Sequence, residues 1–437
     1  MKKKILLKSC LLTQSGYAQH AKLIYDALST RPDLFDLYII PTNWGNCSWQ
    51  SEISSWRDGV DALIEKTVRY HHEMQGKPIY DISIQVDIPS AFELMAPINI
   101  GVSAMVETSK ISHQWVERIN AMDLVLVPSQ HAKQIAENSV YQGHDVNTKE
   151  PMTLKVTTPI EVVPYHVDDA IVGYVDGIRT PTRLELDIPD NSFLCVAQWG
   201  PRKSLPETIT WFVEEFFDQD VGLVVKTSVG GGSLVDREET ERRLRMLLSK
   251  YQDRKCKVLL LHGNLTNEEM IILHSDPRIK ANINIAHGEG YGLPIFESAQ
   301  LGVPNITINW SGQTDFLYAP EKSKKTKNTK MKAMFAQVEY DLSEVQPEAV
   351  WGDIIIKDSK WAFADQGSYK MRLRDVLKNH PKYVKKAKKL QKHILESDQF
   401  NKDKIFEKIV ELVSPDANVS EEDINTWLAN FDTKEFN

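Results

Sequence analysis

The sequence predicts an α/β protein made of two doubly wound domains that face each other across a cleft. Short apolar segments alternate with amphipathic segments, and strands that alternate with helices form parallel sheets with right-handed crossovers. The alternation occurs in two series, and 437 residues are enough for two or three domains. In such domains ligands bind at the carboxyl ends of the strands.

The first series predicts an N-terminal domain over residues 1–170. Residues 5–12 have the pattern of a buried strand, which is followed by a turn at 13–16 and an amphipathic helix at about 17–29. Helical patterns lie between several of the later strands. These strands are predicted at 37–40, 81–86, 98–102, 124–127 and 161–163.

The second series predicts another domain over residues 185–380. The segment 168–189 carries Gly173, Gly177 and Pro181, and is the predicted linker between the two domains. The strands of this second domain are predicted at 193–197, 221–226, 258–261, 281–285 and 305–308.

Composition narrows the classes of protein to consider. The formal net charge of -8 disfavours a surface that is basic throughout, although it allows a local basic patch. Four widely spaced cysteines without a C-x-x-C pair indicate neither a zinc site nor a disulfide framework. The N-terminal apolar run is interrupted by Lys8, unlike a signal peptide, and no apolar run is long enough to span a membrane. We expect a cytoplasmic protein, with contact at a membrane surface as an alternative.

The most informative segment is 287–304, which reads HGEGYGLPIFESAQLGVP. Its glycines allow main-chain N–H groups to come close to a ligand. Pro294 suits the first position of a helix, and Gly302 and Pro304 supply the stop. Because free amides and the positive end of the helix dipole converge there, the segment predicts an anion site, most naturally for phosphate.

Two carboxylates, Glu289 and Glu297, lie eight positions apart around this turn. A nucleotide sugar presents a diphosphate flanked by the hydroxyl groups of ribose and hexose, so carboxylates on either side of an anion site fit such a ligand. The alternative is that Glu297 complements the helix dipole and that Glu289 is a loop charge.

The segment closely resembles the E-x7-E signature of retaining GT-B glycosyltransferases, especially the family 4 type (glycosyl transferases group 1). It departs from the usual form at His287 and Ser298, and Ala197 stands where one branch of the family has arginine. The resemblance implies two Rossmann-like domains and C-terminal helices, here 381–437, that cross back to the N-terminal domain. Further segments match in the same order, at 105–129, 164–168, 198–203, 223–227 and 263–270.

The resemblance implies retaining transfer of a hexose from a UDP- or GDP-sugar to a hydroxyl acceptor, either a glycan or a lipid-linked saccharide. Glu289 and Lys203 take the catalytic roles, with Glu289 against the transferred sugar and Glu297 on the ribose. Cations neutralise the departing diphosphate. The donor-binding residues are Arg202, Lys226, Leu265, Gly290, Tyr291, Gly292, Leu293 and Glu297.

The acceptor side and the question of a metal follow from the same resemblance. No metal or other cofactor is expected, because the sole D-x-D is Asp218 to Asp220 before a predicted strand, and nothing else supplies further oxygen ligands. His113 is a further candidate proton carrier. The acceptor-side candidates are Gly16, Tyr17, Glu107 and His166.

Two segments each hold six lysines, namely 322–332, which is predicted to be a mobile loop, and 381–393, which is predicted to be a helix. They are solvated faces, or they meet an anionic lipid surface or a nucleic acid. The rival functions are therefore a glycosyltransferase for hydroxymethylated bases in DNA, which the acidic net charge disfavours, and an inactive nucleotide-sugar-binding protein. The oligomeric state, the donor sugar and the acceptor are not predicted.

Overall fold

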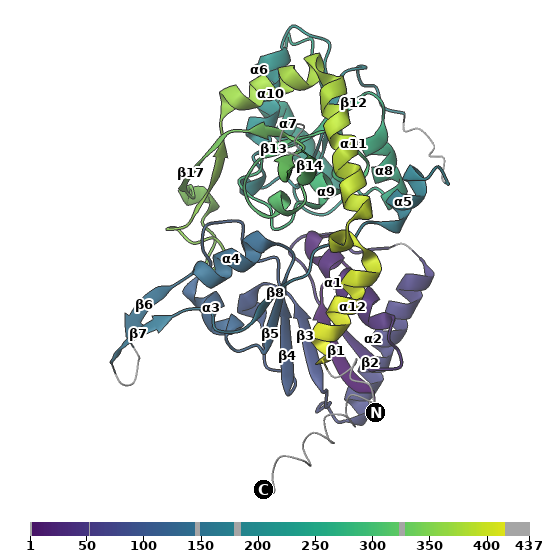
Figure 1. Ribbon diagram of the computed structural model, residues 1–437, viewed down its shortest axis with the longest axis vertical. Helices are drawn as coiled ribbons and strands as arrows, with labels where there is room; N and C mark the ends of the chain where they lie inside the picture. The colour runs from purple at the N-terminus through teal and green to yellow at the C-terminus, as the bar shows by residue number, and fades with distance from the viewer. Residues whose placement is uncertain (1, 52, 145–148, 179–184, 323–327, 416–437) are drawn as a thin grey trace, which may run out of the picture.

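The computed structural model describes residues 2–51, 53–144, 149–178, 185–322 and 328–415, which form two stacked α/β domains (Figure 1). The first domain holds a six-stranded parallel sheet in the order β2-β1-β3-β4-β5-β8. Every strand predicted for this domain is present. The bounds are β1 Lys3–Ser9, β2 Phe35–Pro41, β3 Ile82–Val86, β4 Ile98–Val102, β5 Leu124–Val127 and β8 Ile160–Val162.

The first strand is shorter than predicted, because the chain turns where the Thr13 N–H donates to the Cys10 carbonyl at 2.9 Å. The first helix begins at Gly16, since the Ser15 side chain accepts from the Ala18 N–H and caps it. The remaining elements of this domain are helices around the sheet and one antiparallel hairpin. They are α1 Gly16–Ser29, α2 Ser55–Glu73, α3 His113–Ile119, α4 Gln130–Asn138 and the hairpin β6 Tyr141–His144 with β7 Pro151–Leu154.

The second domain holds a six-stranded parallel sheet in the order β11-β10-β9-β12-β13-β16, which contains all the strands predicted for it. The strands are β9 Ser192–Val196, β10 Gly222–Lys226, β11 Lys257–Leu261, β12 Ile279–Asn284, β13 Asn305–Ile308 and β16 Ala336–Val338. The helices are α6 Leu205–Phe216, α7 Leu234–Leu248, α8 Asn267–Ser275, α9 Leu293–Gln300 and α10 Gln366–Lys378.

Two antiparallel hairpins are added to this domain, β14 Tyr318–Lys322 with β15 Thr329–Ala333, and β17 Tyr340–Glu344 with β18 Lys360–Ala364. The first hairpin corrects the prediction of a loop over 322–332, because Lys322 ends β14 and residues 329–332 belong to β15. Residues 323–327 lie outside the described residues.

Strand order fixes where a ligand site can lie in the second domain. β10 and β11 are added on one side of β9, whereas β12, β13 and β16 are added on its other side. The connections after β9 and β12 therefore leave in opposite directions, and a crevice forms between the carboxyl ends of these two neighbouring strands.

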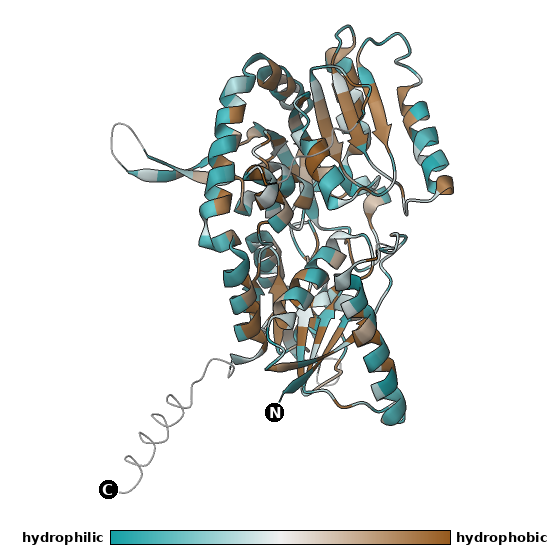
Figure 2. Ribbon diagram, turned by 90° about the vertical axis from the view of Figure 1, so that its right-hand side faces the viewer, coloured by the Kyte–Doolittle hydropathy of each residue, from teal (hydrophilic) through white to brown (hydrophobic). Residues whose placement is uncertain are grey.

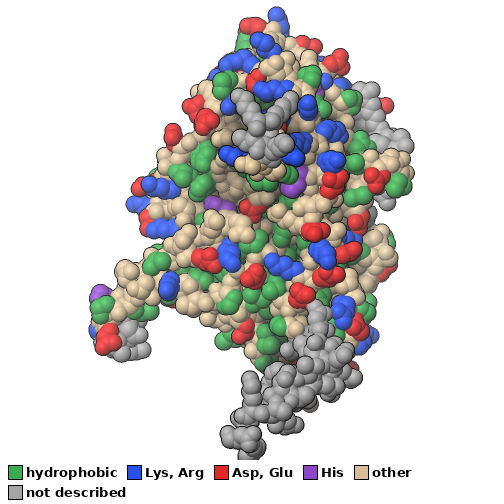
Figure 3. Space-filling model, viewed as in Figure 1, with side chains coloured by type: hydrophobic (Ala, Val, Ile, Leu, Met, Phe, Trp, Pro, Cys, Tyr) green, Lys and Arg blue, Asp and Glu red, His purple; other side chains and the backbone are tan. Residues whose placement is uncertain are grey.

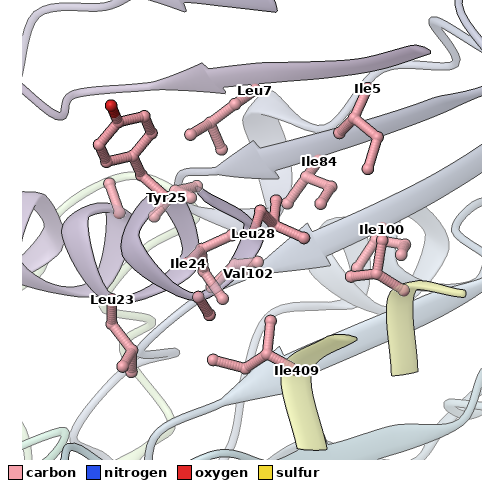
Figure 4. Packing of buried hydrophobic residues seen from close by; sticks show 14 of the residues in the cluster. Ile5, Leu7, Leu23, Ile24, Tyr25, Leu28, Ile84, Ile100, Val102 and Ile409 are labelled. Carbon is pink, nitrogen blue, oxygen red and sulfur yellow. The ribbon is translucent and has the colours of Figure 1, made fainter. Parts of the chain in front are cut away.

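The C-terminal helices connect the two domains. α11, His380–Glu396, packs on the second domain through Leu390 and Ile394. After a short 3-10 turn, α12, Lys402–Val413, enters the core of the first domain (Figure 4), where Ile409 lies near Ile24 and Leu28 of α1. Among the described residues, the last helix thus completes the first core, as the fold prediction requires, while residues 416–437 of the predicted C-terminal segment lie outside the described residues.

The predicted linker 168–189 contains a helix, α5 Asp169–Val175, whose Ile171 packs against Ile271 and Leu301 of the second domain. Residues 179–184 are outside the described residues. Hydrophobic residues concentrate on the strands, while the outer helix faces are hydrophilic (Figure 2). Among the described residues, no helix combines the length and apolar character needed to cross a membrane.

Candidate functional site

A buried carboxylate and two cations meet at the crevice between β9 and β12. Lys203 donates from Nζ to both carboxylate oxygens of Glu289 at 2.7 Å, and Arg202 Nη1 lies 3.0 Å from Glu289 Oε2. Asn284 Nδ2 donates to Glu289 Oε1 at 2.9 Å. The cations follow β9 in the 3-10 turn Pro201–Lys203, and Glu289 follows β12. The predicted catalytic pair is therefore in direct contact.

The charges of this group depend on one another. Burial by itself would raise the pKa of Glu289, but Lys203 and Arg202 lower it to about 2. Burial lowers the pKa of Lys203, and the neighbouring Arg202 lowers it further, while Glu289 opposes the shift. Burial also disfavours charged Arg202, but Glu107 and Glu289 raise its pKa. Each cation is thus held in place by carboxylates that an incoming anion would have to replace.

The glycine-rich turn follows Glu289 and leads into α9. Gly292 has φ of +93°, which favours glycine, and it precedes the first helical residue, Leu293. Pro294 is therefore the second helical residue rather than the first. None of the described residues accepts a hydrogen bond from the backbone N–H of Gly290, Tyr291, Gly292 or Leu293. The unpaired amides at this helix N-terminus are what an anion site requires, and anion binding there stays a prediction.

Close packing, more than backbone angle, explains two further glycines at the site, Gly288 and Gly312. A Cβ on Gly312 would lie 2.1 Å from the Gly290 carbonyl oxygen, and one on Gly288 would lie 2.7 Å from the Glu107 carbonyl oxygen. The Gly288 carbonyl accepts from Arg202 Nη1 at 2.7 Å, and the Gly290 carbonyl accepts from Ser129 Oγ at 2.7 Å. The turn is therefore fixed by contacts with both domains.

Three further predicted donor residues belong to the second domain. Glu297 is in α9, its side chain is 37% exposed, and its Oε2 lies 3.6 Å from Nε2 of the buried His274. Lys226 ends β10, and burial lowers its pKa while Glu297 opposes that shift. Leu265 follows β11 and packs with Val196 in a small apolar cluster.

The acceptor-side candidates Tyr17, Gly16 and Glu107 face the glycine-rich turn from the first domain. The Tyr17 hydroxyl lies 3.0 Å from Ser103 Oγ, and its ring stacks on Trp44 with centroids 3.9 Å apart. The Gly16 carbonyl accepts from the Tyr165 hydroxyl at 3.2 Å, and Tyr165 packs against Tyr291 of the turn. Glu107 Oε1 lies 3.0 Å from Arg202 Nη1 and bridges the domains.

The two histidines proposed as proton carriers do not join this group. His166 packs its ring against Phe406 of α12, and its Nδ1 lies 2.7 Å from the Val167 carbonyl oxygen. The ring of His113 packs against Tyr141. Among the described residues, neither histidine contacts Glu289 or the two cations. The acceptor-side role of His166 stays a prediction.

Several residues of the site were missed in the sequence. Asn284 holds Glu289, and Ser311 Oγ accepts from the Glu289 N–H at 2.8 Å. Asp315 Oδ2 accepts from the N–H of Gln130, the first residue of α4, at 2.7 Å across the domain interface. Burial raises the pKa of Asp315 to about 6. Asn284 could have been predicted as a site residue, because it is a polar residue at the end of a buried strand.

The described residues include no group of three or more His, Cys, Asp or Glu side chains that could hold a metal ion. Asp218 and Asp220 of the D-x-D lie between α6 and β10, as predicted. Metal independence stays a prediction.

Comparison with known proteins identifies the fold. Two facing doubly wound domains of this topology, joined by helices that return to the first domain, constitute the GT-B fold of glycosyltransferases. No protein-family model matches the chain, and no curated protein matches it. Solved structures of this fold do match over nearly the whole chain.

Three of these structures illustrate the likeness. Sucrose-phosphate synthase from Thermosynechococcus elongatus is 11% identical with a TM-score of 0.59, covering 96% of this chain and 100% of its own. HepE from Anabaena, in complex with UDP and glucose, is 13% identical with a TM-score of 0.53. That match covers 94% of this chain and 100% of the HepE chain. A trehalose-6-phosphate structure from E. coli bound with UDP-2-fluoro glucose is 10% identical with a TM-score of 0.54. That match covers 94% of this chain and 99% of the E. coli chain. At these identities the likeness establishes the fold.

Proposed function

We propose that the protein is a retaining glycosyltransferase that moves a hexose from a nucleotide-diphosphate sugar to a hydroxyl acceptor without a metal ion. The observation that carries this proposal is the ion-pair group formed by the buried Glu289 with the partly exposed Lys203 and Arg202, together with the free amides of the glycine-rich turn. It lies between β9 and β12, where ligands of doubly wound sheets bind.

Bond cleavage in such a donor places negative charge on the departing diphosphate. Lys203 and Arg202 supply charged side-chain donors to that charge, and the amides of residues 290–293 supply backbone donors. A phosphate would compete with Glu289 and Glu107 for the same cations. The site therefore stabilises a developing anion with groups that are already oriented, which is the main requirement of this chemistry.

The two glutamates take different parts in the proposal. Glu289 is ionised and buried, so it offsets positive charge on the sugar and orients its hydroxyl groups. Glu297 is partly exposed in the first turns of α9 and accepts from the ribose hydroxyls, with Lys226 nearby. Retention follows from the resemblance to E-x7-E enzymes, in which the departing phosphate helps to deprotonate the acceptor on the same face of the sugar.

The test begins with a thermal-shift panel of UDP- and GDP-sugars, with and without EDTA. We expect at least one sugar nucleotide to raise the Tm, and Glu297→Gln to remove that shift. Mass spectrometry of glycan and lipid-linked acceptors should then show a gain of one hexose, and NMR of the product should show the donor's anomeric configuration. Donor binding with neither hydrolysis nor transfer would instead establish a nucleotide-sugar-binding protein.

A further inference from the structure

A surface of lysines extends over α11 and the β14–β15 hairpin. On α11, Lys382, Lys385, Lys386 and Lys389 lie within about 100° of one another around the helix, on the side away from the buried Ile394. The hairpin adds exposed lysines beside them. We call this set the lysine face: Lys322, Lys330, Lys332, Lys382, Lys385, Lys386, Lys389 and Lys392.

The hairpin and the helix form one surface because they contact each other directly. Glu321 of β14 lies 2.8 Å from Lys332 and 3.5 Å from Lys389, so this acidic residue is already paired within the face. Lys386 Nζ donates to the Ala333 carbonyl at 3.5 Å. Burial lowers the pKa of Lys386, and the neighbouring Lys382 lowers it further. The like charges are thus held close together.

The lysine face is open to a partner. Figure 2 shows the hydrophilic hairpin projecting from the body of the protein beside α11, and Figure 3 shows lysine and arginine side chains gathered over this part of the surface. Among the described residues, Lys322, Lys330 and Lys385 have no salt-bridge partner. This concentration of cations occurs on a protein with a formal net charge of -8. Charge complementarity therefore indicates an anionic partner.

We propose that the lysine face binds the surface of an anionic membrane. The eight cations that define it are lysines, which are flexible point charges suited to an array of mobile lipid phosphates, and Arg372 lies near Lys386 beside them. Among them lies Met331, which is 56% exposed and gives the hairpin an apolar contact with the lipid boundary. A nucleic-acid surface would instead favour arginine forks and aromatic rings that read or stack on bases.

The same surface connects to the proposed catalytic group. The hairpin begins shortly after the 3-10 turn Gly312–Asp315, and the Gly312 N–H donates to the Glu289 carbonyl at 2.9 Å. Membrane binding would therefore bring the site close to a lipid-linked acceptor. That last step rests on the proposed transferase function, whereas the binding of vesicles does not.

Co-sedimentation of the full-length protein with lipid vesicles tests the proposal without any sugar nucleotide. We expect binding to mixed phosphatidylglycerol and phosphatidylcholine vesicles, no binding to phosphatidylcholine alone, and release as NaCl rises from about 0.05 to 0.5 M. The variant Lys322→Gln/Lys330→Gln/Lys385→Gln should bind the anionic vesicles roughly a hundredfold more weakly, at about fivefold for each lysine.

A matched control removes the same charge elsewhere. Lys77→Gln/Lys155→Gln/Lys255→Gln changes three exposed lysines outside the face and should bind vesicles like the wild type. Equal losses in both triple variants, or equal binding to neutral and anionic vesicles, would overturn the proposal. Tighter binding to duplex DNA than to anionic vesicles would also overturn it. Donor-induced thermal shifts of the same variants report on the transferase site separately.

Discussion

Lys203 and Glu289, 86 positions apart in the chain, share two hydrogen bonds of 2.7 Å at the carboxyl edge of the second sheet. If either side chain moved alone, the other would lose its shortest ion pair in a largely buried setting, which is costly in a protein interior. The pair therefore keeps both groups oriented at the crevice between β9 and β12. This mutual constraint underlies the first two predictions.

Replacing Glu289 by glutamine should lower hexose transfer by a hundredfold or more, because the carboxylate that balances charge at the reacting centre is lost. The Tm should also fall, since Lys203 would lose its carboxylate partner and Arg202 would keep only Glu107. Initial rates and thermal melts measure both effects. Glu239→Gln is the control, because Glu239 also pairs with two arginines but lies on the surface of α7, where such pairs stabilise little. Wild-type turnover by Glu289→Gln would falsify the assignment.

Glu107→Gln should bind a nucleoside diphosphate about two- to fivefold more tightly, because a carboxylate that competes for Arg202 Nη1 is removed. Isothermal titration calorimetry with UDP and GDP measures the change. Asp358→Asn breaks a different interdomain ion pair, with Lys110, and should leave the affinity unchanged. Weaker binding by Glu107→Gln would mean that Glu107 helps to hold the donor instead of competing with it.

Gly312→Ala should abolish donor-induced stabilisation and lower the Tm, because the new Cβ would meet the Gly290 carbonyl oxygen at 2.1 Å and force the turn to move. The control Gly143→Ala places a methyl group where no atom lies within 4 Å, so its melting behaviour should match the wild type. Thermal melts with and without a sugar nucleotide make the comparison. Normal donor binding by Gly312→Ala would contradict the close approach of these two segments.

Asp315 should make stability depend on pH. Its pKa is raised from 3.8 to about 6 in the folded state, so the folded protein binds this proton more tightly than the unfolded chain. The stabilisation from protonation is complete below pH 4 and is lost as the pH rises through 6. Asp315→Asn, which keeps an acceptor for the Gln130 N–H, should therefore raise the Tm at pH 7.5 relative to wild type, with a smaller gain at pH 4.

Melting curves of both proteins across this pH range provide the measurement. Asp253→Asn, at an exposed position, serves as the control for the change in net charge. If Asp315→Asn raised the Tm by the same amount at pH 4 and pH 7.5, a group other than Asp315 would control the pH dependence of stability.

Much of the fold could be predicted because a run of apolar residues in the sequence indicates a buried segment of the chain. The strand at 305–308 was predicted with the bounds that the structure shows, since all four of its residues are buried. The segment 5–12 was predicted too long, because Leu11 and Leu12 are also buried although the chain has already turned. Burial alone does not distinguish the end of a strand from the buried turn that follows it.

The site was less predictable, since its contacts join distant segments. Asp315 is a loop aspartate in sequence, and only domain docking places it at the N-terminus of α4. Tyr17, at the start of α1, stacks on Trp44 of the loop after β2, a contact that no periodic pattern in the sequence indicates. The β14–β15 hairpin was missed because its lysines suggested a solvated loop, and its strands are largely exposed. By contrast, the E-x7-E segment located Glu289 because its glycines and its helix start are local features.

The position of α12 affects how the chain folds during synthesis. Ile405, Phe406 and Ile409 belong to the same core as Ile5 and Ile24, which are made first. A nascent chain that ends after the second domain still exposes the apolar surface that α12 will cover. The first domain to emerge from the ribosome is therefore the last to reach its native packing, and its exposed surface needs protection from aggregation until translation ends.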